Sequence, residues 1–181
     1  MRKILPVILL LILAVPVVAQ LQTTGPDNTL KIGDMAPDFT IPSRPGQRGA
    51  QGTTLAQLTK DKNVLIMFYP AAFSPGCTNE FTQAGVHYDK FTALNVEMVG
   101  ISRDLIWAAY AFGDKVGAKN LFASDTDFTI IPKYGATNAN RATLRHYYLV
   151  DKTGKIVWKD TTNSVLDTEK MAATLAGVLK K

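Results

Sequence analysis

The stretch "NVLIMFYPAAFSPGC", residues 63–77, decides the fold of this chain and points to its chemistry. It opens with a continuous apolar run of the kind that forms a central strand, buried on both faces. Pro70 ends this strand because proline removes a backbone donor from the sheet, and Pro75 is favoured in the first turn of a helix. We therefore expect a buried strand, a bend and then a helix from about Pro75 to Phe91.

Cys77, the only cysteine in the chain, falls in the first turn of the expected helix. The unpaired backbone N–H groups and the positive end of the helix dipole favour a thiolate there. Ionisation alone raises reactivity by a factor of roughly 30 at most, so a fast thiol enzyme must also orient its electrophile and stabilise the leaving group. Ser74 can aim a hydroxyl into the same pocket, which Phe73 and Phe81 can keep partly dry. We interpret Cys77 as a nucleophile; the alternative is a small, inert core residue.

The N-terminal residues have the pattern of a secretory signal. Two basic residues precede an apolar run over residues 4–19, and small side chains at Val17 and Ala19 suit a cleavage site. We expect residues 1–19 to be a cleaved signal peptide and the protein to be secreted or periplasmic. The alternative is a membrane-anchored protein that keeps this segment, but prolines interrupt the run and it falls short of the roughly 20 residues that span a bilayer.

Length and composition predict one folded domain after this signal. The chain has 181 residues, of which 46% are hydrophobic, enough to bury a core without disulfides. Residues 20–30 are polar and turn-prone and read as a flexible leader, so the domain covers residues 31–181. The net charge of +5 is a mild, scattered excess without a nucleic-acid motif, and we expect no nucleic-acid partner. With one cysteine, His87 and His146 are too few for a metal site, and no cofactor is expected.

Strand and helix patterns alternate along the domain and then give way to a hairpin. Strands are predicted at residues 95–102 and 120–125, a helix at 104–117 with Asp104 as its cap, and a short helix at 126–135. The runs "RHYYLV" and "KIVWKD" flank the turn "DKTG", and an amphipathic helix closes the chain. This order predicts an α/β fold with a central mixed β-sheet flanked by helices on both faces. The aromatic residues of the 104–117 helix should pack it against the sheet; they are Trp107, Tyr110 and Phe112.

The segment "FYPAAFSPGCTNE", residues 68–80, resembles the peroxidatic motif of the peroxiredoxin family, Pro-x-x-x-Thr/Ser-x-x-Cys. "IGDMAPDFTIP", residues 32–42, is similar to the segment that opens the family's domain, and "RHYYLVDKTGKIV" is similar to its arginine-bearing strand and hairpin. The resemblance implies a thioredoxin-like fold and a thiol-dependent peroxidase of the AhpC/TSA or bacterioferritin-comigratory-protein type. It further implies hydrogen peroxide or small organic hydroperoxides as substrates, and family members often form homodimers.

The resemblance also assigns roles to individual residues. Cys77 would attack the peroxide and become a sulfenic acid, while Ser74 and the backbone near Gly76 would bind the peroxide oxygens. Pro70 would shield the pocket from water. Arg145 would stabilise the thiolate and the developing negative charge, since a guanidinium stays cationic and carries several donors in a fixed fork.

These assignments leave alternatives open. Arg141, four positions earlier, competes with Arg145 for the same role. Ser74 can instead cap the helix, a common function of serine that is compatible with substrate binding. Glu80, at the acidic position that often follows the family's cysteine, has a supporting part or only complements the helix dipole.

One departure from the family pattern concerns a second cysteine. Many relatives have a resolving cysteine five residues after the first, where this chain has Thr82. The oxidised form must then be reduced by an external thiol, either a small thiol or a thioredoxin-like dithiol protein, and is exposed to irreversible oxidation.

Two other functions remain as alternatives. A thioredoxin-type thiol-disulfide oxidoreductase needs Cys-x-x-Cys, and its first position is Ser74 here. A redox-silent binding module on the same fold would tolerate Cys77→Ser.

Overall fold

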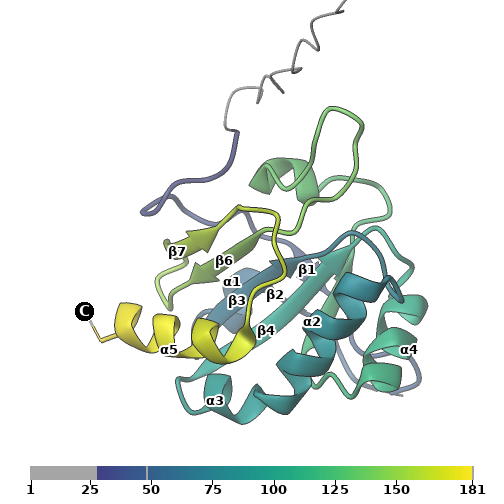
Figure 1. Ribbon diagram of the computed structural model, residues 1–181, viewed down its shortest axis with the longest axis horizontal. Helices are drawn as coiled ribbons and strands as arrows, with labels where there is room; N and C mark the ends of the chain where they lie inside the picture. Colours follow the sequence, from purple (N-terminus) through teal and green to yellow (C-terminus); the bar gives the residue numbers. More distant parts are fainter. Residues whose placement is uncertain (1–27, 48, 181) are drawn as a thin grey trace, which may run out of the picture.

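A five-stranded mixed sheet runs through the centre of the computed structural model, which describes residues 28–47 and 49–180 (Figure 1). The strands lie in the order β5-β4-β3-β6-β7. The first three are parallel, whereas β6 and β7 form an antiparallel hairpin. Their bounds are β3 Asn63–Phe68, β4 Val96–Ser102, β5 Leu121–Ser124, β6 Tyr147–Val150 and β7 Ile156–Asp160. The predicted central strand and terminal hairpin are confirmed.

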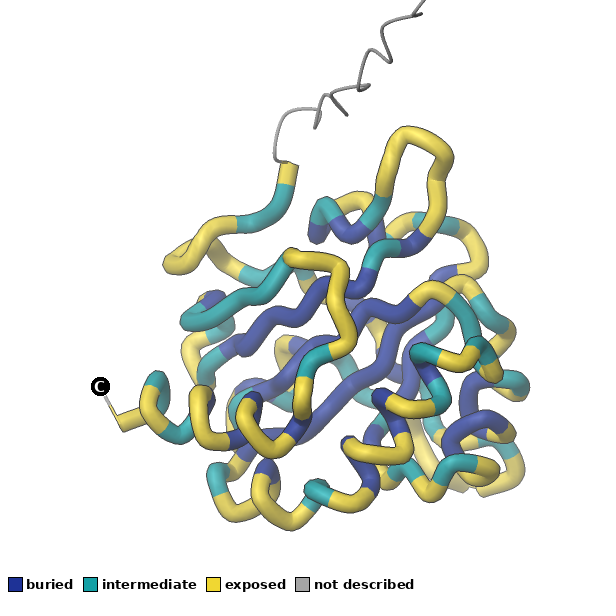
Figure 2. The backbone as a smooth tube through the Cα atoms, in the orientation of Figure 1, coloured by how far each residue is buried: buried dark blue, intermediate teal, exposed yellow. Residues whose placement is uncertain are grey.

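Helices cover both faces of this sheet, as predicted. The face with the larger hydrophobic core packs against four helices, α2 Pro75–Val86, α3 Tyr88–Thr92, α4 Ile106–Val116 and α5 Thr168–Val178. The opposite face packs against α1 Leu55–Leu58, the 3-10 helix η1 Ile131–Tyr134 and the small hairpin of β1 Thr40–Ile41 and β2 Thr53–Thr54. Figure 2 shows the central strands buried between these layers. Side chains of β3 alternate between the two cores, which explains its uninterrupted apolar sequence.

The topology brings the loop before α2 and the start of β6 to the same edge of the sheet. Because β3, β4 and β5 are parallel, their carboxyl ends all lie at this edge. Met67, near the end of β3, pairs with Tyr147 at the beginning of the antiparallel strand β6. Residues just before Tyr147 therefore meet the residues that follow β3.

The helices differ from the sequence predictions in their boundaries. The helix expected from Pro75 to Phe91 is broken at His87, whose φ of −96° and ψ of 10° end α2 and start α3. The segment predicted as a helix at 126–135 contains only the single turn of η1, which ends at Gly135 as expected. Gly117 closes α4 with a φ of 70°, a conformation that favours glycine.

Two predictions for α4 are wrong. Asp104 does not cap the helix, which begins after Leu105. The carboxylate of Asp104 instead accepts hydrogen bonds from the backbone of Ala72, at 2.7 Å, and from the hydroxyl of Ser102, at 2.9 Å. Trp107 does not pack against the sheet but is 67% exposed, whereas Tyr110 and Phe112 are buried as predicted.

The N-terminal predictions fall largely outside the described part of the chain. The expected signal peptide at 1–19 and residues 20–27 of the expected leader lie outside it. The last leader residues pack against the domain: Thr29 accepts a hydrogen bond from Lys159 Nζ at 2.7 Å, and Leu30 joins the core. Within residues 28–47 and 49–180, no helix has both the length and the apolar character needed to cross a membrane.

Candidate active site

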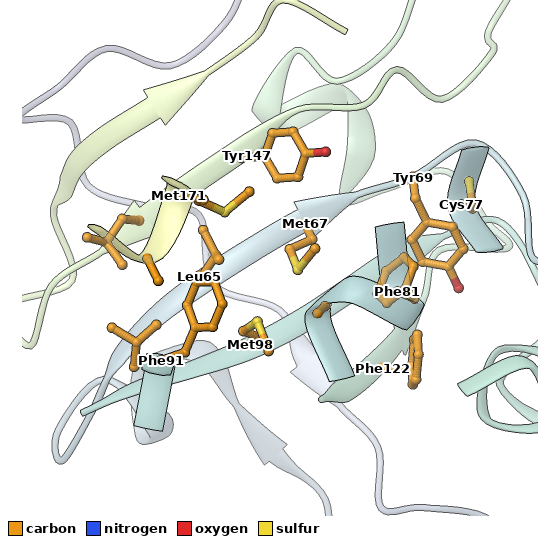
Figure 3. Packing of buried hydrophobic residues seen from close by; sticks show 14 of the residues in the cluster. Leu65, Met67, Tyr69, Cys77, Phe81, Phe91, Met98, Phe122, Tyr147 and Met171 are labelled. Carbon is orange, nitrogen blue, oxygen red and sulfur yellow. The ribbon is translucent and has the colours of Figure 1, made fainter. Parts of the chain in front are cut away.

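Cys77 lies in the first turn of α2, where the sequence places it. Ser74 occupies the N-cap position with extended backbone, Pro75 is the first helical residue, and the first helical hydrogen bond runs from Thr78 N to Ser74 O at 2.8 Å. The amides of Gly76 and Cys77 precede this bond and have no acceptor within the helix. Cys77 is fully buried in the same core cluster as Tyr69 and Phe81, and Figure 3 shows it next to the Tyr69 ring. The site therefore combines free amide donors with a dry environment.

Arg145, which lies two positions before the first residue of β6, approaches this sulfur. Its Nη2 atom donates to Cys77 Sγ at 3.1 Å, and the residue is only 8% exposed. Its Nε atom donates to Glu80 Oε2 at 2.7 Å. Glu80 lies one helical turn after Cys77 and is also fully buried. The Arg145 guanidinium thus donates to the thiol through Nη2 and to the buried Glu80 carboxylate through Nε.

Tyr147 completes this network and was not identified from the sequence. Its hydroxyl donates to Glu80 Oε1 at 2.7 Å and lies 3.2 Å from the carbonyl oxygen of Ser164. Both carboxylate oxygens of Glu80 are therefore engaged, one by the guanidinium and one by the phenol. Tyr147 stands two positions after Arg145, and side chains two apart in a strand share a face. That spacing is the signal by which it could have been found.

The buried network controls the charges of its members. Burial raises the pKa of Glu80, although the hydrogen bonds from Arg145 and Tyr147 act in the opposite direction. Burial lowers the pKa of Arg145, but the hydrogen bond and charge of Glu80 outweigh it and raise the pKa overall. Burial and the nearby carboxylate also raise the pKa of Tyr147. The guanidinium consequently stays cationic and the phenol stays a donor.

The other residues predicted for the site do not join this network. The Ser74 hydroxyl donates to Ala71 O at 3.0 Å and makes no side-chain cap bond to α2, so Ser74 holds the N-cap position without capping by its side chain. Pro70 is exposed on the loop. A methyl group at Gly76 would lie 3.4 Å from Arg145 Nη2 and 3.6 Å from Val165 Cγ2. Glycine therefore leaves about the room of one methyl group between the helix backbone and the guanidinium.

Arg141 does not reach the thiol. Its guanidinium carbon lies 4.5 Å from the centre of the Phe128 ring. Between the two arginines considered from sequence, the structure thus places Arg145 at the sulfur.

Phe73 also departs from its expected position. It has a φ of 63°, an uncommon conformation for a bulky residue, and is 57% exposed, with its ring edge-on to Phe112 at 5.3 Å. Of the two aromatic residues predicted to shield the site from water, only Phe81 is buried in the same cluster as Cys77. Among the residues that the structure describes, no three His, Cys, Asp or Glu side chains cluster as a metal site would require.

A thiol in the first turn of a helix, beside a buried guanidinium and on a mixed α/β sheet, defines a thiol-dependent oxidoreductase. The AhpC/TSA family model matches residues 32–159, and the chain belongs to this family. Peroxiredoxin bcp1 of Schizosaccharomyces pombe is 33% identical over 77% of this chain and 71% of its own length. Peroxiredoxin Bcp of Escherichia coli is 29% identical over 71% of this chain and 84% of its own length. The chain is accordingly a peroxiredoxin, an enzyme that reduces peroxides with thiols.

Solved structures show the same fold. The crystal structure of peroxidoxin BcpB from Mycobacterium tuberculosis superimposes with a TM-score of 0.72 and 26% identity, covering 82% of this chain and 97% of that one. The reduced 2-Cys peroxiredoxin of Plasmodium vivax gives a TM-score of 0.72 at 23% identity, covering 83% of each chain. The predicted thioredoxin-like fold is confirmed.

Proposed function

We propose that Cys77 is the peroxidatic nucleophile and Arg145 the group that stabilises its charge. The thiolate of Cys77 attacks the terminal oxygen of a hydroperoxide, so that an S–O bond forms as the O–O bond breaks. The leaving alkoxide or hydroxide takes a proton from solvent and departs as an alcohol or water. The sulfur is oxidised by two electrons to a sulfenic acid, and the peroxide is reduced by the same two electrons.

The contact between Arg145 Nη2 and Cys77 Sγ, at 3.1 Å, carries this proposal. A cation at this distance is placed to stabilise negative charge both on the sulfur and on the leaving oxygen. Glu80 and Tyr147 orient the guanidinium from the side away from the sulfur. An inert core cysteine has no need of such a network, so the geometry supports catalysis over a redox-silent binding module.

Reduction of the sulfenic acid needs thiols from outside the chain. A first thiol displaces the sulfenic oxygen as water and forms a mixed disulfide, and a second thiol releases Cys77 while the external pair becomes a disulfide. No second cysteine exists in the sequence, and Thr82 occupies the position five residues after Cys77. The absence of Cys-x-x-Cys also argues against a disulfide oxidoreductase, because Ser74 stands at its first position.

The space at the site favours small peroxides. Cys77 is fully buried, and the room beside Gly76 is bounded by Arg145 and Val165 within 3.6 Å of a methyl-sized group. We therefore expect hydrogen peroxide and small organic hydroperoxides as substrates, with the first-turn amides and the Ser74 hydroxyl as further ligands of the peroxide oxygens.

The N-terminal sequence supports a secreted or periplasmic location. The basic residues, the apolar run and the small residues at 17 and 19 together form the three parts of a signal peptide. Sequencing the N-terminus of the mature protein tests this directly. A mature chain that begins after Ala19 is expected, and one that still carries residue 2 would favour a membrane anchor.

The peroxidase proposal is tested by peroxide consumption with dithiothreitol as the reductant. Wild-type protein should accelerate the reaction well beyond dithiothreitol alone, and Cys77→Ser should return it to the uncatalysed rate. Circular dichroism of Cys77→Ser should match the wild type, since the hydroxyl replaces a thiol of similar size. A wild-type rate equal to that of the free dithiol would refute the proposal.

A further inference from the structure

Two arginine side chains stack on a single aromatic ring at the active-site edge of the sheet. The guanidinium carbons of Arg103 and Arg141 lie 4.9 Å and 4.5 Å from the centre of the Phe128 ring. Each contact is a cation–π interaction, which orients the guanidinium while leaving its N–H donors available. We refer to Arg103, Phe128 and Arg141 as the twin-arginine cluster.

Tight turns hold Phe128 in position. The carboxylate of Asp125 accepts the backbone N–H groups of Thr129, Ile130 and Ile131 at 2.7 to 2.9 Å. The Phe128 N–H itself donates to the Asp125 carbonyl oxygen at 3.0 Å. This network fixes Phe128 at a φ of 60°, an unfavourable conformation for an aromatic residue.

A second tight turn holds Arg141. The Asn138 side chain accepts the backbone N–H groups of Asn140 and Ala142, both at 3.0 Å, and Arg141 N donates to Asn138 O at 2.9 Å. Arg141 has a φ of 59°. Strained backbone at both Phe128 and Arg141 is an observation that points to function, because such strain persists only where the surroundings enforce it.

The two positive charges of the cluster form no ion pair with the neighbouring carboxylates, whose oxygens accept hydrogen bonds from other groups. Asp104 accepts from Ala72 and Ser102, Asp125 from its own turn, and Asp127 from the Thr129 hydroxyl. Within residues 28–47 and 49–180, no carboxylate lies within salt-bridge distance of Arg103 or Arg141. Both arginines are exposed. Two like charges held on one ring without a counter-ion form a preorganised site for an anion.

The cluster lies at the same edge as the buried thiol. Arg103 directly follows β4, and Arg141 lies in the exposed residues 138–142 of the segment between η1 and β6, which also carries Arg145 (Figures 1 and 2). The bond from Ala72 N to Asp104 ties the loop before Cys77 to the segment after Arg103. The exposed apolar side chains of these two segments add a hydrophobic component; they are Phe73, Leu105 and Trp107, each at least 57% exposed. Trp, Phe and Arg side chains together are typical of protein-binding surfaces.

We propose that the twin-arginine cluster docks the reductant, a dithiol protein whose surface is acidic around its reactive thiol. This inference rests on the proposed function, because a one-cysteine peroxidase must receive its electrons at this edge. Carboxylates of the partner pair with Arg103 and Arg141, and the exposed apolar side chains contact the partner beside them. Charge complementarity of this kind increases the rate of encounter and weakens with salt.

The test compares Arg103→Gln/Arg141→Gln with the matched control Lys152→Gln/Lys155→Gln. Both variants remove two positive charges, but the control residues lie in the β6–β7 turn at the opposite edge of the sheet. The probe is a thioredoxin of net negative charge. We expect kcat/KM for this thioredoxin to fall about tenfold in the arginine variant at low salt and to stay within about twofold of wild type in the lysine variant. Turnover with dithiothreitol should be unchanged in both.

Direct binding separates this proposal from the peroxidase function. The affinity of the same thioredoxin for the Cys77→Ser protein is measured by calorimetry, with and without the arginine substitutions, and needs no turnover. Equal affinities, or an equal loss in the lysine variant, overturn the docking proposal. A rise in KM for a carboxylate-bearing hydroperoxide without any change toward thioredoxin also overturns it, because the cluster would then bind substrate. Absence of dithiothreitol-driven turnover in the wild type would instead refute the peroxidase.

Discussion

The Nη2 atom of Arg145 lies 3.1 Å from the Sγ atom of Cys77, although the two residues stand 68 positions apart in the sequence. The contact exists because the antiparallel strand β6 starts at the edge where the parallel strand β3 ends. A lysine at this position would offer a single charged nitrogen, whereas arginine binds Glu80 with Nε and Cys77 with Nη2 at once. The site thus depends on the fork geometry of the guanidinium as well as on its charge.

Replacing Arg145 by lysine should slow oxidation of Cys77 by hydrogen peroxide about a hundredfold, since a lysine cannot serve both partners. Single-turnover stopped-flow kinetics without a reductant measures this step alone. Arg141→Lys is the matched control, and its rate should equal that of wild type because the Arg141 guanidinium stacks on Phe128. A large loss in the control and none in Arg145→Lys would reverse the assignment of the two arginines.

Tyr147→Phe should lower both stability and activity. The change removes the donor at 2.7 Å from Glu80 Oε1 and leaves a buried carboxylate oxygen unpaired, at a cost of about 1–3 kcal/mol. A less firmly held Glu80 should orient Arg145 less well, and we expect the oxidation rate to fall about tenfold, which corresponds to about 1.4 kcal/mol of lost transition-state stabilisation.

Tyr148→Phe is the control for this effect. Its hydroxyl donates to Tyr134 O at 2.6 Å in the core on the opposite face of the sheet. It should lose comparable stability in urea unfolding while keeping the wild-type oxidation rate. Equal rates for the two variants would show that Tyr147 is only structural.

The sequence predicted the parts of the site that depend on local rules. Pro75 and the apolar strand before it are local signals, and they placed Cys77 correctly in the first turn of α2. The position of Arg145 came from the family resemblance, and the register of β3 against β6 then brings it to the sulfur. Tyr147 was not predicted because β6 is buried on both faces, so the apolar pattern of the strand did not single it out; only its spacing of two from Arg145 indicates the side that faces Glu80.

The errors arose where tertiary contacts compete with local preference. Asp104 has the right residue type for a cap, but its carboxylate is used to join Ala72 and Ser102 at the active-site edge. Trp107 has the composition of a core residue, yet it lies on the solvent side of α4, whereas Ile106 and Ala109 of the same turn pack against the core. Both departures lie at the surface that we assign to reductant docking, where function competes with the simplest packing.

Glu80→Gln should change how stability depends on pH. Folding raises the pKa of Glu80 above its usual 4.5, mainly through burial, so the folded protein holds this proton more tightly than the unfolded chain. The stabilisation linked to Glu80 is therefore fully present below pH 4.5 and is lost as the pH rises through the folded pKa. The free energy of unfolding of wild type relative to Glu80→Gln should decrease over this range, by up to about 1.4 kcal/mol per pH unit.

Urea unfolding at a series of pH values measures this difference. Glu80→Gln also loses the ion pair with Arg145, which changes the absolute free energy of unfolding. We therefore compare only how the difference between wild type and variant changes with pH. A difference that grows with pH would mean that the folded pKa is lowered, contrary to the effect of burial.

Thr82→Cys tests whether α2 can open to expose Cys77. Thr82 is exposed on α2, where its hydroxyl donates to Thr78 O at 2.7 Å. Five residues of helix rise about 7.5 Å along the axis, which exceeds the roughly 7 Å that a disulfide can bridge between Cα atoms. A disulfide between Cys77 and the introduced thiol can therefore form only if the first turns of α2 unwind. We expect one equivalent of hydrogen peroxide to produce it, with a loss of helical circular dichroism that dithiothreitol reverses.

The same variant should resist irreversible oxidation, because the disulfide removes the sulfenic acid before a second peroxide reacts with it. Wild type and Thr174→Cys should both proceed to the sulfinic acid in excess peroxide, as measured by mass spectrometry. Thr174 is a matched control since it is an exposed helical threonine that donates to Lys170 O at 3.0 Å, but on α5. If Thr82→Cys is oxidised to the sulfinic acid as readily as these proteins, α2 stays closed after oxidation, and an external thiol must reach Cys77 through the space beside Gly76 instead.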